Sequence, residues 1–173
     1  MQLSALLALG LAVVQTHAVP TTPAPGSSPL NKRTVDNLFE SDELIICPDP
    51  SKWAYSRPQV EAAIQQGINL TPTNEPQPGG FPKRFYNRPD NLNFGSKCRN
   101  KDLWEFPIMH NREIYGGGPA GPDRVVFWIY TDNPDTKPTV NGMYCGVMTH
   151  DGMDNNRFQL CPVEEWIPGG ITR

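Results

Sequence analysis

The sequence predicts an α+β domain in which one helix is followed by an antiparallel sheet. One segment, SRPQVEAAIQQGINL, has helical spacing of apolar residues and precedes every strand-like segment. Four later segments are rich in β-branched and aromatic residues, which favours strands. Because helices and strands do not alternate along the chain, the pattern indicates an antiparallel sheet rather than a parallel one. At 173 residues, one domain is expected.

The first 33 residues are expected to be removed from the mature protein. Residues 1–18 read as a secretory signal peptide, because the apolar run from Leu3 to Val14 is too short to span a bilayer and a cleavage site at Ala18 follows it. Residues 19–33 are rich in Pro, Ser and Thr and end in Lys32-Arg33. We interpret them as a disordered pro-segment cut after the dibasic pair, although the pair is also compatible with two solvated charges. Residues 34–173 would then form a single secreted, extracellular domain, with no membrane-spanning segment.

The expected helix has recognisable start and stop signals. Ser56 can cap it, Pro58 suits its first turn, and Gly67 is expected to stop it. The sequon Asn69-Leu70-Thr71 then predicts a glycosylation site in the loop that follows.

Four segments are expected to form strands: Leu103–Ile108, Arg124–Tyr130, Met143–His150 and Arg157–Cys161. Pro107 predicts a break or bulge in the first of them. Asn141-Gly142 is a hairpin-turn signal, so the second and third strands should pair antiparallel. Residues 71–80 and 116–122 read as loops, and residues 162–173 show no clear pattern.

The cysteines indicate disulfides rather than a metal site. In a secreted chain four cysteines predict two disulfides, with three possible pairings. There is no Cys-x-x-Cys pair, and His110 and His150 are the only histidines after the leader. We therefore expect no metal and no other cofactor.

The charge is acidic overall but uneven. After cleavage, 13 Lys and Arg stand against 18 Asp and Glu, so the field of the whole protein does not favour nucleic acid. Between Phe81 and Arg112, however, the basic residues outnumber the acidic ones; they are Lys83, Arg84, Arg88, Lys97, Arg99, Lys101 and Arg112. This segment is compatible either with a local basic patch or with a solvated loop.

Three polar residues in or beside the expected strands can carry chemistry. Each has an ordinary interpretation: Glu105 on an exposed strand face, Arg124 in a surface ion pair, His150 in a turn hydrogen bond. If neighbouring strands place all three on one face, they form an acid–base pair with a guanidinium. That set suits metal-independent cleavage of a phosphodiester.

Three ordered motifs support this hypothesis: "EFPI", "YGGGPAGPDRVVF" and "CGVMTHDGMDNNRF". Together they resemble the small fungal guanyl-specific ribonucleases and their ribotoxin relatives, over residues 60–161. The resemblance implies a helix packed on an antiparallel sheet. It also implies a monomeric enzyme that cleaves single-stranded RNA to a 2′,3′-cyclic phosphate without a metal.

The resemblance also implies roles for individual residues. Glu105 would be the general base, His150 the general acid and Arg124 the transition-state cation, with Phe158 packed beside the phosphate. The positions expected to contact the base are Phe81, Tyr86, Asn87 and Asn156. The implied disulfides are Cys47–Cys161 and Cys98–Cys145.

One motif departs from the family. Phe81-Pro82-Lys83 stands where the family has Tyr-Pro-His, so we expect Lys83 to bind phosphate and to hold Glu105 ionised. Three functions remain open: an active endoribonuclease, a ribonuclease-like RNA-binding effector with little turnover, and a ribotoxin that acts on ribosomal RNA. The acidic charge disfavours the ribotoxin.

Overall fold

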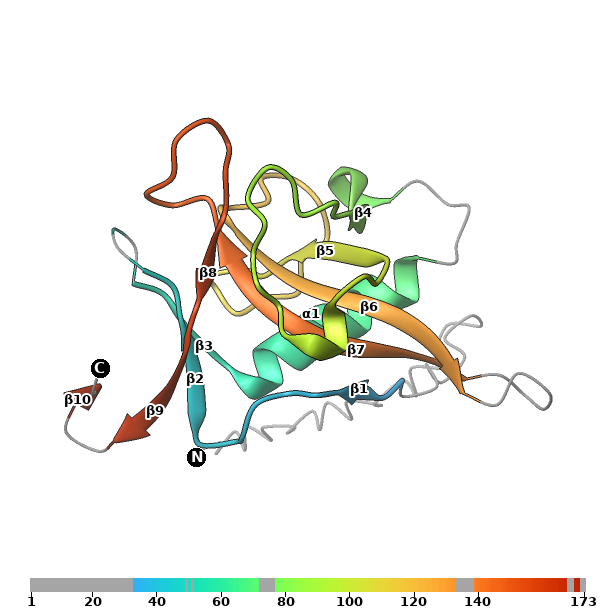
Figure 1. Ribbon diagram of the computed structural model, residues 1–173, viewed down its shortest axis with the longest axis horizontal. Helices are drawn as coiled ribbons and strands as arrows, with labels where there is room; N and C mark the ends of the chain where they lie inside the picture. Colours follow the sequence, from blue (N-terminus) through green and yellow to red (C-terminus); the bar gives the residue numbers. More distant parts are fainter. Residues whose placement is uncertain are drawn as a thin grey trace, which may run out of the picture. The chain divides into compact units, whose positions relative to one another are not determined.

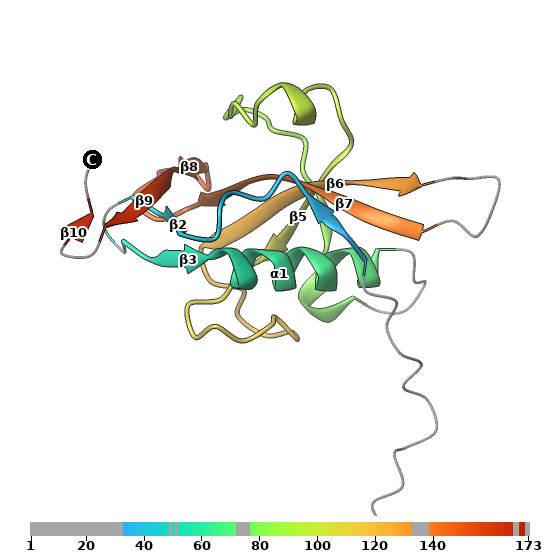
Figure 2. The same cartoon turned by 90° about the horizontal axis from the view of Figure 1, so that it is seen from below.

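A six-stranded sheet forms the centre of the domain, with one helix against one of its faces (Figures 1 and 2). The computed structural model describes residues 33–48, 50, 52–71, 77–132, 139–167 and 170–171. Within the sheet the strand order is β1-β7-β6-β5-β4, with β8 paired to β7. The strands are β1 (Val35–Asp36), β4 (Lys83–Arg84), β5 (Leu103–Pro107), β6 (Asp123–Asp132), β7 (Thr139–Thr149) and β8 (Gln159–Cys161).

The expected antiparallel pairing is present, and only β1 runs parallel to its neighbour. A second sheet, which the sequence did not predict, has the order β10-β9-β2-β3. It consists of β2 (Glu43–Ile46), β3 (Ala54–Ser56), β9 (Val163–Ile167) and β10 (Gly170–Ile171). Two short 3-10 helices, η1 (Pro78–Gly80) and η2 (Ser96–Cys98), complete the elements. The expected signal peptide, and the pro-segment up to Lys32, lie outside the described residues.

Helix α1 (Arg57–Leu70) begins as expected but ends later. The Ser56 amide donates to Gln59 Oε1 at 3.1 Å, which fixes the first turn. Gly67 is not a stop: it lies on the buried face, where an added Cβ would be 2.7 Å from the Phe127 ring. Glycine at this position lets the helix approach β6 closely. The sequon asparagine Asn69 lies in the last turn of α1 and not in a loop, which corrects its expected setting.

Two cores lie on opposite faces of the central sheet. The larger core contains the buried side of α1, with Val60, Ile64 and Ile68, and packs on Val125 and Phe127 of β6. The smaller core contains Cys98, Leu103, Val126 and Met148. Figure 2 shows that the connection from β4 to β5 covers the face opposite α1. Alternate residues of β6 therefore point into different cores.

A β-bulge in β7 meets the second disulfide. Val126 pairs with Gly146 while Phe127 pairs with Tyr144, so Cys145 is the extra residue. Cys145 bonds to Cys98, which ties the β4–β5 connection to the sheet. The other disulfide joins Cys47 to Cys161 over a sequence separation of 114 residues, worth about 5 kcal/mol in the chain-entropy model. These are the two pairs that the family resemblance implied.

Two expectations about strand ends were wrong. Asn141 and Gly142 lie inside β7 and not in a turn; an alanine at Gly142 would clash with Ile68, so packing explains this glycine. Pro107 is the last residue of β5, which fits the expected break, and the bulge is in β7. The last segment begins pairing at Gln159, because Arg157 lies in the preceding turn. Among the described residues, no helix is long and apolar enough to cross a membrane.

Gly67→Ala should lower the free energy of unfolding, because the new methyl group must displace the Phe127 ring, which costs about 1–3 kcal/mol. The roughly 1 kcal/mol that alanine gains over glycine within a helix offsets part of this cost, so the net loss should be up to about 2 kcal/mol. Urea denaturation measures the difference. Gln66→Ala, on the neighbouring half-buried position, is the matched control. A Gly67→Ala protein more stable than the wild type would contradict the close packing.

Candidate active site

The polar residues predicted from the sequence form a diagonal row across four adjacent strands. Lys83 pairs with Glu105 between β4 and β5, and Glu105 pairs with Val126 of β6. Arg124 is two residues from Val126 and therefore points to the same face. Arg124 pairs with Met148 of β7, and His150 follows two residues later. The sheet register thus places Lys83, Glu105, Arg124 and His150 on the face opposite α1.

Glu105 is a desolvated carboxylate beside two cations. Burial raises its pKa above the ordinary value, while Arg124 and, to a lesser degree, Lys83 lower it. Its Oε2 atom is buried and has no hydrogen-bond partner among the described residues. A buried polar atom without a partner is unusual in a folded protein. A carboxylate oxygen without a partner is chemically able to accept a proton.

Arg124 is held in place by the backbone before it. Its Nη1 atom donates to the carbonyls of Ala120, Gly121 and Asp123 at 2.8–3.1 Å. The side chain is 8% exposed, and the guanidinium lies 4.9 Å from the centre of the Phe81 ring. Burial lowers the pKa of Arg124, and the Glu105 carboxylate opposes that shift. The result is a fixed cation beside the carboxylate.

His150 is oriented by two contacts. Its Nδ1 atom lies 2.7 Å from the Arg157 carbonyl oxygen, which can only accept, so Nδ1 carries a hydrogen. Its ring stacks on Phe158 with centroids 3.6 Å apart. Burial lowers the pKa of His150, an effect that the Arg157 carbonyl partly offsets. Nε2 is consequently the atom through which this histidine can exchange a proton with a substrate.

Lys83 and Phe81 occupy the position where the motif departs from the family. Lys83 is exposed, and its ammonium lies 4.2 Å from the centre of the Phe81 ring. Phe81 is 4% exposed and belongs to the larger core. Its expected contact with a base therefore does not fit its burial. The Phe81 ring instead makes cation–π contacts with Lys83 and Arg124.

Comparison with known proteins agrees with this geometry. A family model described as ribonuclease matches residues 47–162, which is more than half of the chain. Guanyl-specific ribonuclease Th1 of Trichoderma harzianum is 30% identical over 62% of this chain and 89% of its own length. Guanyl-specific ribonuclease U1 of Ustilago sphaerogena is 32% identical over 62% and 87%. Guanyl-specific ribonuclease T1 of Aspergillus oryzae is 29% identical over 62% and 72%.

The chain belongs to this ribonuclease family. The shared region contains α1, every strand of the central sheet except β1, and every residue of the diagonal row. Residues 1–46 and 163–173, which include β1, β2, β9 and β10, lie outside the matched region. The second sheet is therefore built largely from segments outside the family match.

The other three residues expected to contact a base lie in two loops: Tyr86 and Asn87 in the β4–β5 connection, and Asn156 between β7 and β8. Tyr86 is 80% exposed. The Asn87 side chain is engaged within its own loop, where it donates to the Leu92 carbonyl at 2.8 Å and accepts from the Leu92 amide at 2.7 Å. Asn156 is exposed, with a φ of 59°, in the turn before Phe158. Of the three, Tyr86 and Asn156 present their side chains to solvent, whereas Asn87 braces the loop.

An ion pair that sequence reasoning missed joins these two loops. Arg157 Nε donates to Asp90 Oδ1 at 2.7 Å, and the Asp90 side chain is 4% exposed. Arg157 therefore holds Asp90 with its side chain and His150 with its carbonyl. Its position next to the motif residues Asn156 and Phe158 was the only sequence signal for this contact.

A second group of contacts that sequence reasoning missed surrounds Asp123, the residue before Arg124. Asp123 is fully buried and accepts hydrogen bonds from Tyr55 and, at 2.7 Å, from His110 Nε2. His110 stacks on Trp53 with centroids 4.2 Å apart. Burial and the Asp123 carboxylate raise the pKa of Tyr55. Because side chains alternate along a strand, the sequence could have placed Asp123 on the face of β6 away from Arg124. No nearby sequence feature indicated its contact with Tyr55.

The described residues contain no group of three or more His, Cys, Asp or Glu side chains that could hold a metal ion. The diagonal row itself offers one carboxylate, one imidazole and two cations.

Asp90→Asn should lower the pKa of His150 further, because the Asp90 carboxylate favours the imidazolium and also neutralises Arg157. An NMR titration of the histidine ring protons measures the change, with His150→Gln used to assign the signal. Asp102→Asn is the matched control, since its exposed carboxylate pairs with Arg84 instead. An unchanged His150 pKa in Asp90→Asn would contradict the coupling between the two loops.

Proposed function

We propose that this protein is a secreted endoribonuclease that cleaves single-stranded RNA through a 2′,3′-cyclic phosphate. The observation that carries the proposal is the placement of Glu105, Arg124 and His150 on one face of adjacent strands. Membership of the ribonuclease family supports RNA as the substrate. The two disulfides fit an oxidising compartment, as secretion requires.

In the first step, Glu105 takes the proton of the ribose 2′-hydroxyl, and the 2′-oxygen bonds to phosphorus. The bond from phosphorus to the 5′-oxygen breaks, and His150 Nε2 gives its proton to that oxygen. Arg124 and Lys83 balance the charge that develops on the phosphoryl oxygens. Hydrolysis of the cyclic phosphate reverses the two roles: His150 takes a proton from water and Glu105 returns one to the 2′-oxygen.

The names of the relatives favour guanosine as the base on the 5′ side of the cleaved bond. In this chain, Asn156 and the backbone groups of the loop around Asn87 would read that base, because the Asn87 amide is engaged with Leu92. Tyr86 would offer a stacking surface.

Glu105→Gln and His150→Gln should each reduce kcat/KM by about 10²–10⁴-fold, because each removes one proton-transfer group. The substrates are dinucleoside monophosphates with each of the four bases on the 5′ side, which also measures base preference. In the wild type, the plot of kcat/KM against pH should have a narrow bell shape. Its acid limb should lie above the ordinary glutamate value of 4.5 and its alkaline limb below the ordinary histidine value of 6.5. Full activity in both variants would show that the assignment is wrong.

Lys83→Ala should reduce kcat/KM about ten-fold or more, equivalent to roughly 1.4 kcal/mol of transition-state stabilisation. It should also move the acid limb to higher pH, because loss of the ammonium removes a charge that lowers the Glu105 pKa. Arg112→Ala removes an exposed cation elsewhere and serves as the control.

Lys83→His distinguishes the two remaining functions. In an active enzyme it should retain activity and add a dependence on pH near the imidazole pKa. If it creates activity where the wild type has none, the natural protein is an RNA-binding relative of the ribonucleases and not an enzyme.

A further inference from the structure

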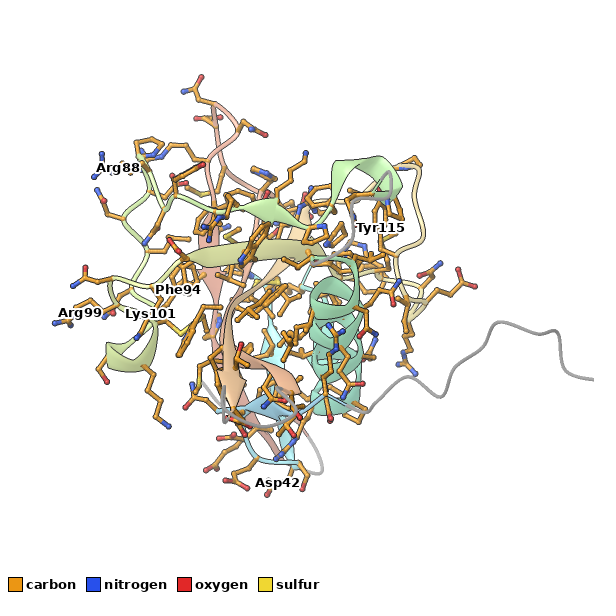
Figure 3. All side chains as sticks on the ribbon, turned by 90° about the vertical axis from the view of Figure 1, so that its right-hand side faces the viewer. Asp42, Arg88, Phe94, Arg99, Lys101 and Tyr115 are labelled. Carbon is orange, nitrogen blue, oxygen red and sulfur yellow. A yellow bond between two sulfur atoms is a disulfide. The ribbon has the colours of Figure 1, made fainter. Side chains whose placement is uncertain are left out.

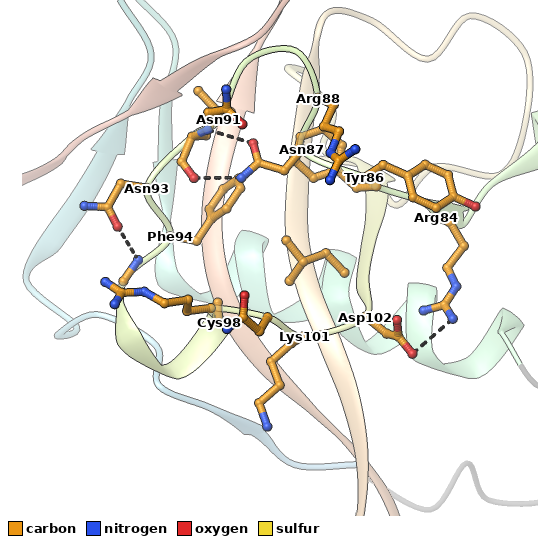
Figure 4. A pocket seen from close by; sticks show the side chains of 16 residues that line it. Arg84, Tyr86, Asn87, Arg88, Asn91, Asn93, Phe94, Cys98, Lys101 and Asp102 are labelled. Carbon is orange, nitrogen blue, oxygen red and sulfur yellow. Dashed lines mark hydrogen bonds and ion pairs between the residues drawn. The ribbon is translucent and has the colours of Figure 1, made fainter.

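A pocket of about 440 Å³ lies in the connection between β4 and β5 (Figure 4). This volume is within the roughly 300–1,000 Å³ of small-ligand sites. Its walls are residues 84–88, 91–95 and 98–103. They include none of the residues given a catalytic role above. They do include Tyr86 and Asn87 of the loop proposed to read the base, so the pocket adjoins the proposed base site without including Asn156 or Phe158.

The pocket is strongly basic. Four of its lining residues are cations and one is a carboxylate, giving a formal charge of +3; the cations are Arg84, Arg88, Arg99 and Lys101. The carboxylate, Asp102, pairs with Arg84 at 3.2 Å. Asp90, the other acid of this segment, is buried against Arg157. In Figure 3, Arg88, Arg99 and Lys101 lie on the side of the molecule away from α1. In a chain with a net charge of −3, this is a local site for a polyanion.

The pocket is also held in shape. The Cys98–Cys145 disulfide attaches one wall of the pocket to β7. The Asn87 side chain closes the loop of residues 87–92 by two hydrogen bonds with the Leu92 backbone. The Lys101 ammonium lies 4.6 Å from the centre of the Trp128 ring. A site that is ordered before binding loses less conformational entropy when its ligand arrives.

The position of the pocket points to a nucleic-acid strand as its ligand. Arg84 and Leu103 line it, and they are respectively one and two residues from Lys83 and Glu105. At a strand rise of about 3.3 Å per residue, Leu103 lies about 7 Å along β5 from the catalytic carboxylate. An RNA chain whose scissile phosphate lies at Glu105 can therefore continue into the pocket. The exposed Tyr86 ring, which lines the pocket, offers a stacking surface to a base of that chain.

We propose that this pocket is a second RNA subsite, which binds backbone phosphates of the single strand that flanks the cleaved bond. The proposal rests on the proposed ribonuclease function for its substrate. Arg88 and Arg99 bind the phosphates, and Lys101 adds to their field. The subsite makes longer RNA a better substrate than a dinucleotide.

The test compares Arg88→Gln/Arg99→Gln with the control Lys52→Gln/Arg112→Gln, which removes two exposed cations outside the pocket. Binding is measured by fluorescence anisotropy with a single-stranded 2′-deoxy oligonucleotide, which lacks the hydroxyl needed for cleavage. The pocket variant should bind about ten-fold more weakly, and its slope of log affinity against log salt should fall by about 1.4. Equal weakening in the control would overturn the subsite.

Cleavage gives the second measurement. On a single-stranded oligoribonucleotide the pocket variant should lose about ten-fold in kcat/KM, while kcat/KM on a dinucleoside monophosphate stays within about two-fold of the wild type. An equal loss on both substrates would overturn the proposal. If the wild type cleaves neither substrate, the proposed function fails, and the binding measurement still decides the subsite. Tight binding of a sulfated polysaccharide in place of the oligonucleotide would overturn RNA as the ligand.

Discussion

The attraction between Glu105 and Arg124 across β5 and β6 is the interaction on which the site depends. Burial disfavours the charged form of both groups, and each charge opposes the shift that burial causes in the other. Removal of one partner would take from the other the largest charge that compensates its burial. The register of two adjacent strands holds this pair together. The protonation state that proposed catalysis needs is therefore a property of the sheet and not of a mobile loop.

In the proposed mechanism, proton transfer and substrate binding fall to different parts of the fold. The strands position the proposed proton-transfer groups, whereas the proposed contacts with the RNA strand come from the β4–β5 connection (Figure 2). The links that attach that connection to the rest of the domain include the Cys98–Cys145 disulfide and the Asp90–Arg157 ion pair. Arg157 also orients His150, so the connection is coupled to the proposed acid. Sequence changes in the loop can alter affinity while leaving the strand register intact.

The sequence predicted β5, β6, β7 and α1 because their apolar patterns are long and strong. It missed β1 and β4, which contain two residues each, and β9, whose sequence VEEWI has acidic residues at its centre. Gly67 and Gly142 misled because local rules assign glycine to stops and turns, whereas here each makes room for a neighbouring side chain. The diagonal row was predictable from strand alternation and family motifs. The Asp90–Arg157 and Tyr55–Asp123 contacts were not, because each joins residues more than 60 positions apart.

Asp123 and Arg124 are consecutive residues of opposite charge that point to opposite faces of β6. A slip of β6 by one position would turn the carboxylate toward the cationic face and press the guanidinium against Tyr55 and the apolar core. Asp123 would lose its hydrogen bonds from Tyr55 and His110, and Arg124 would be buried among apolar side chains away from Glu105. This is more costly than misplacing two apolar residues. The pair therefore helps to fix the register of β6 against its neighbouring strands. The neighbouring residues Val125 and Val126 could not do so, because a one-residue shift exchanges one valine for another.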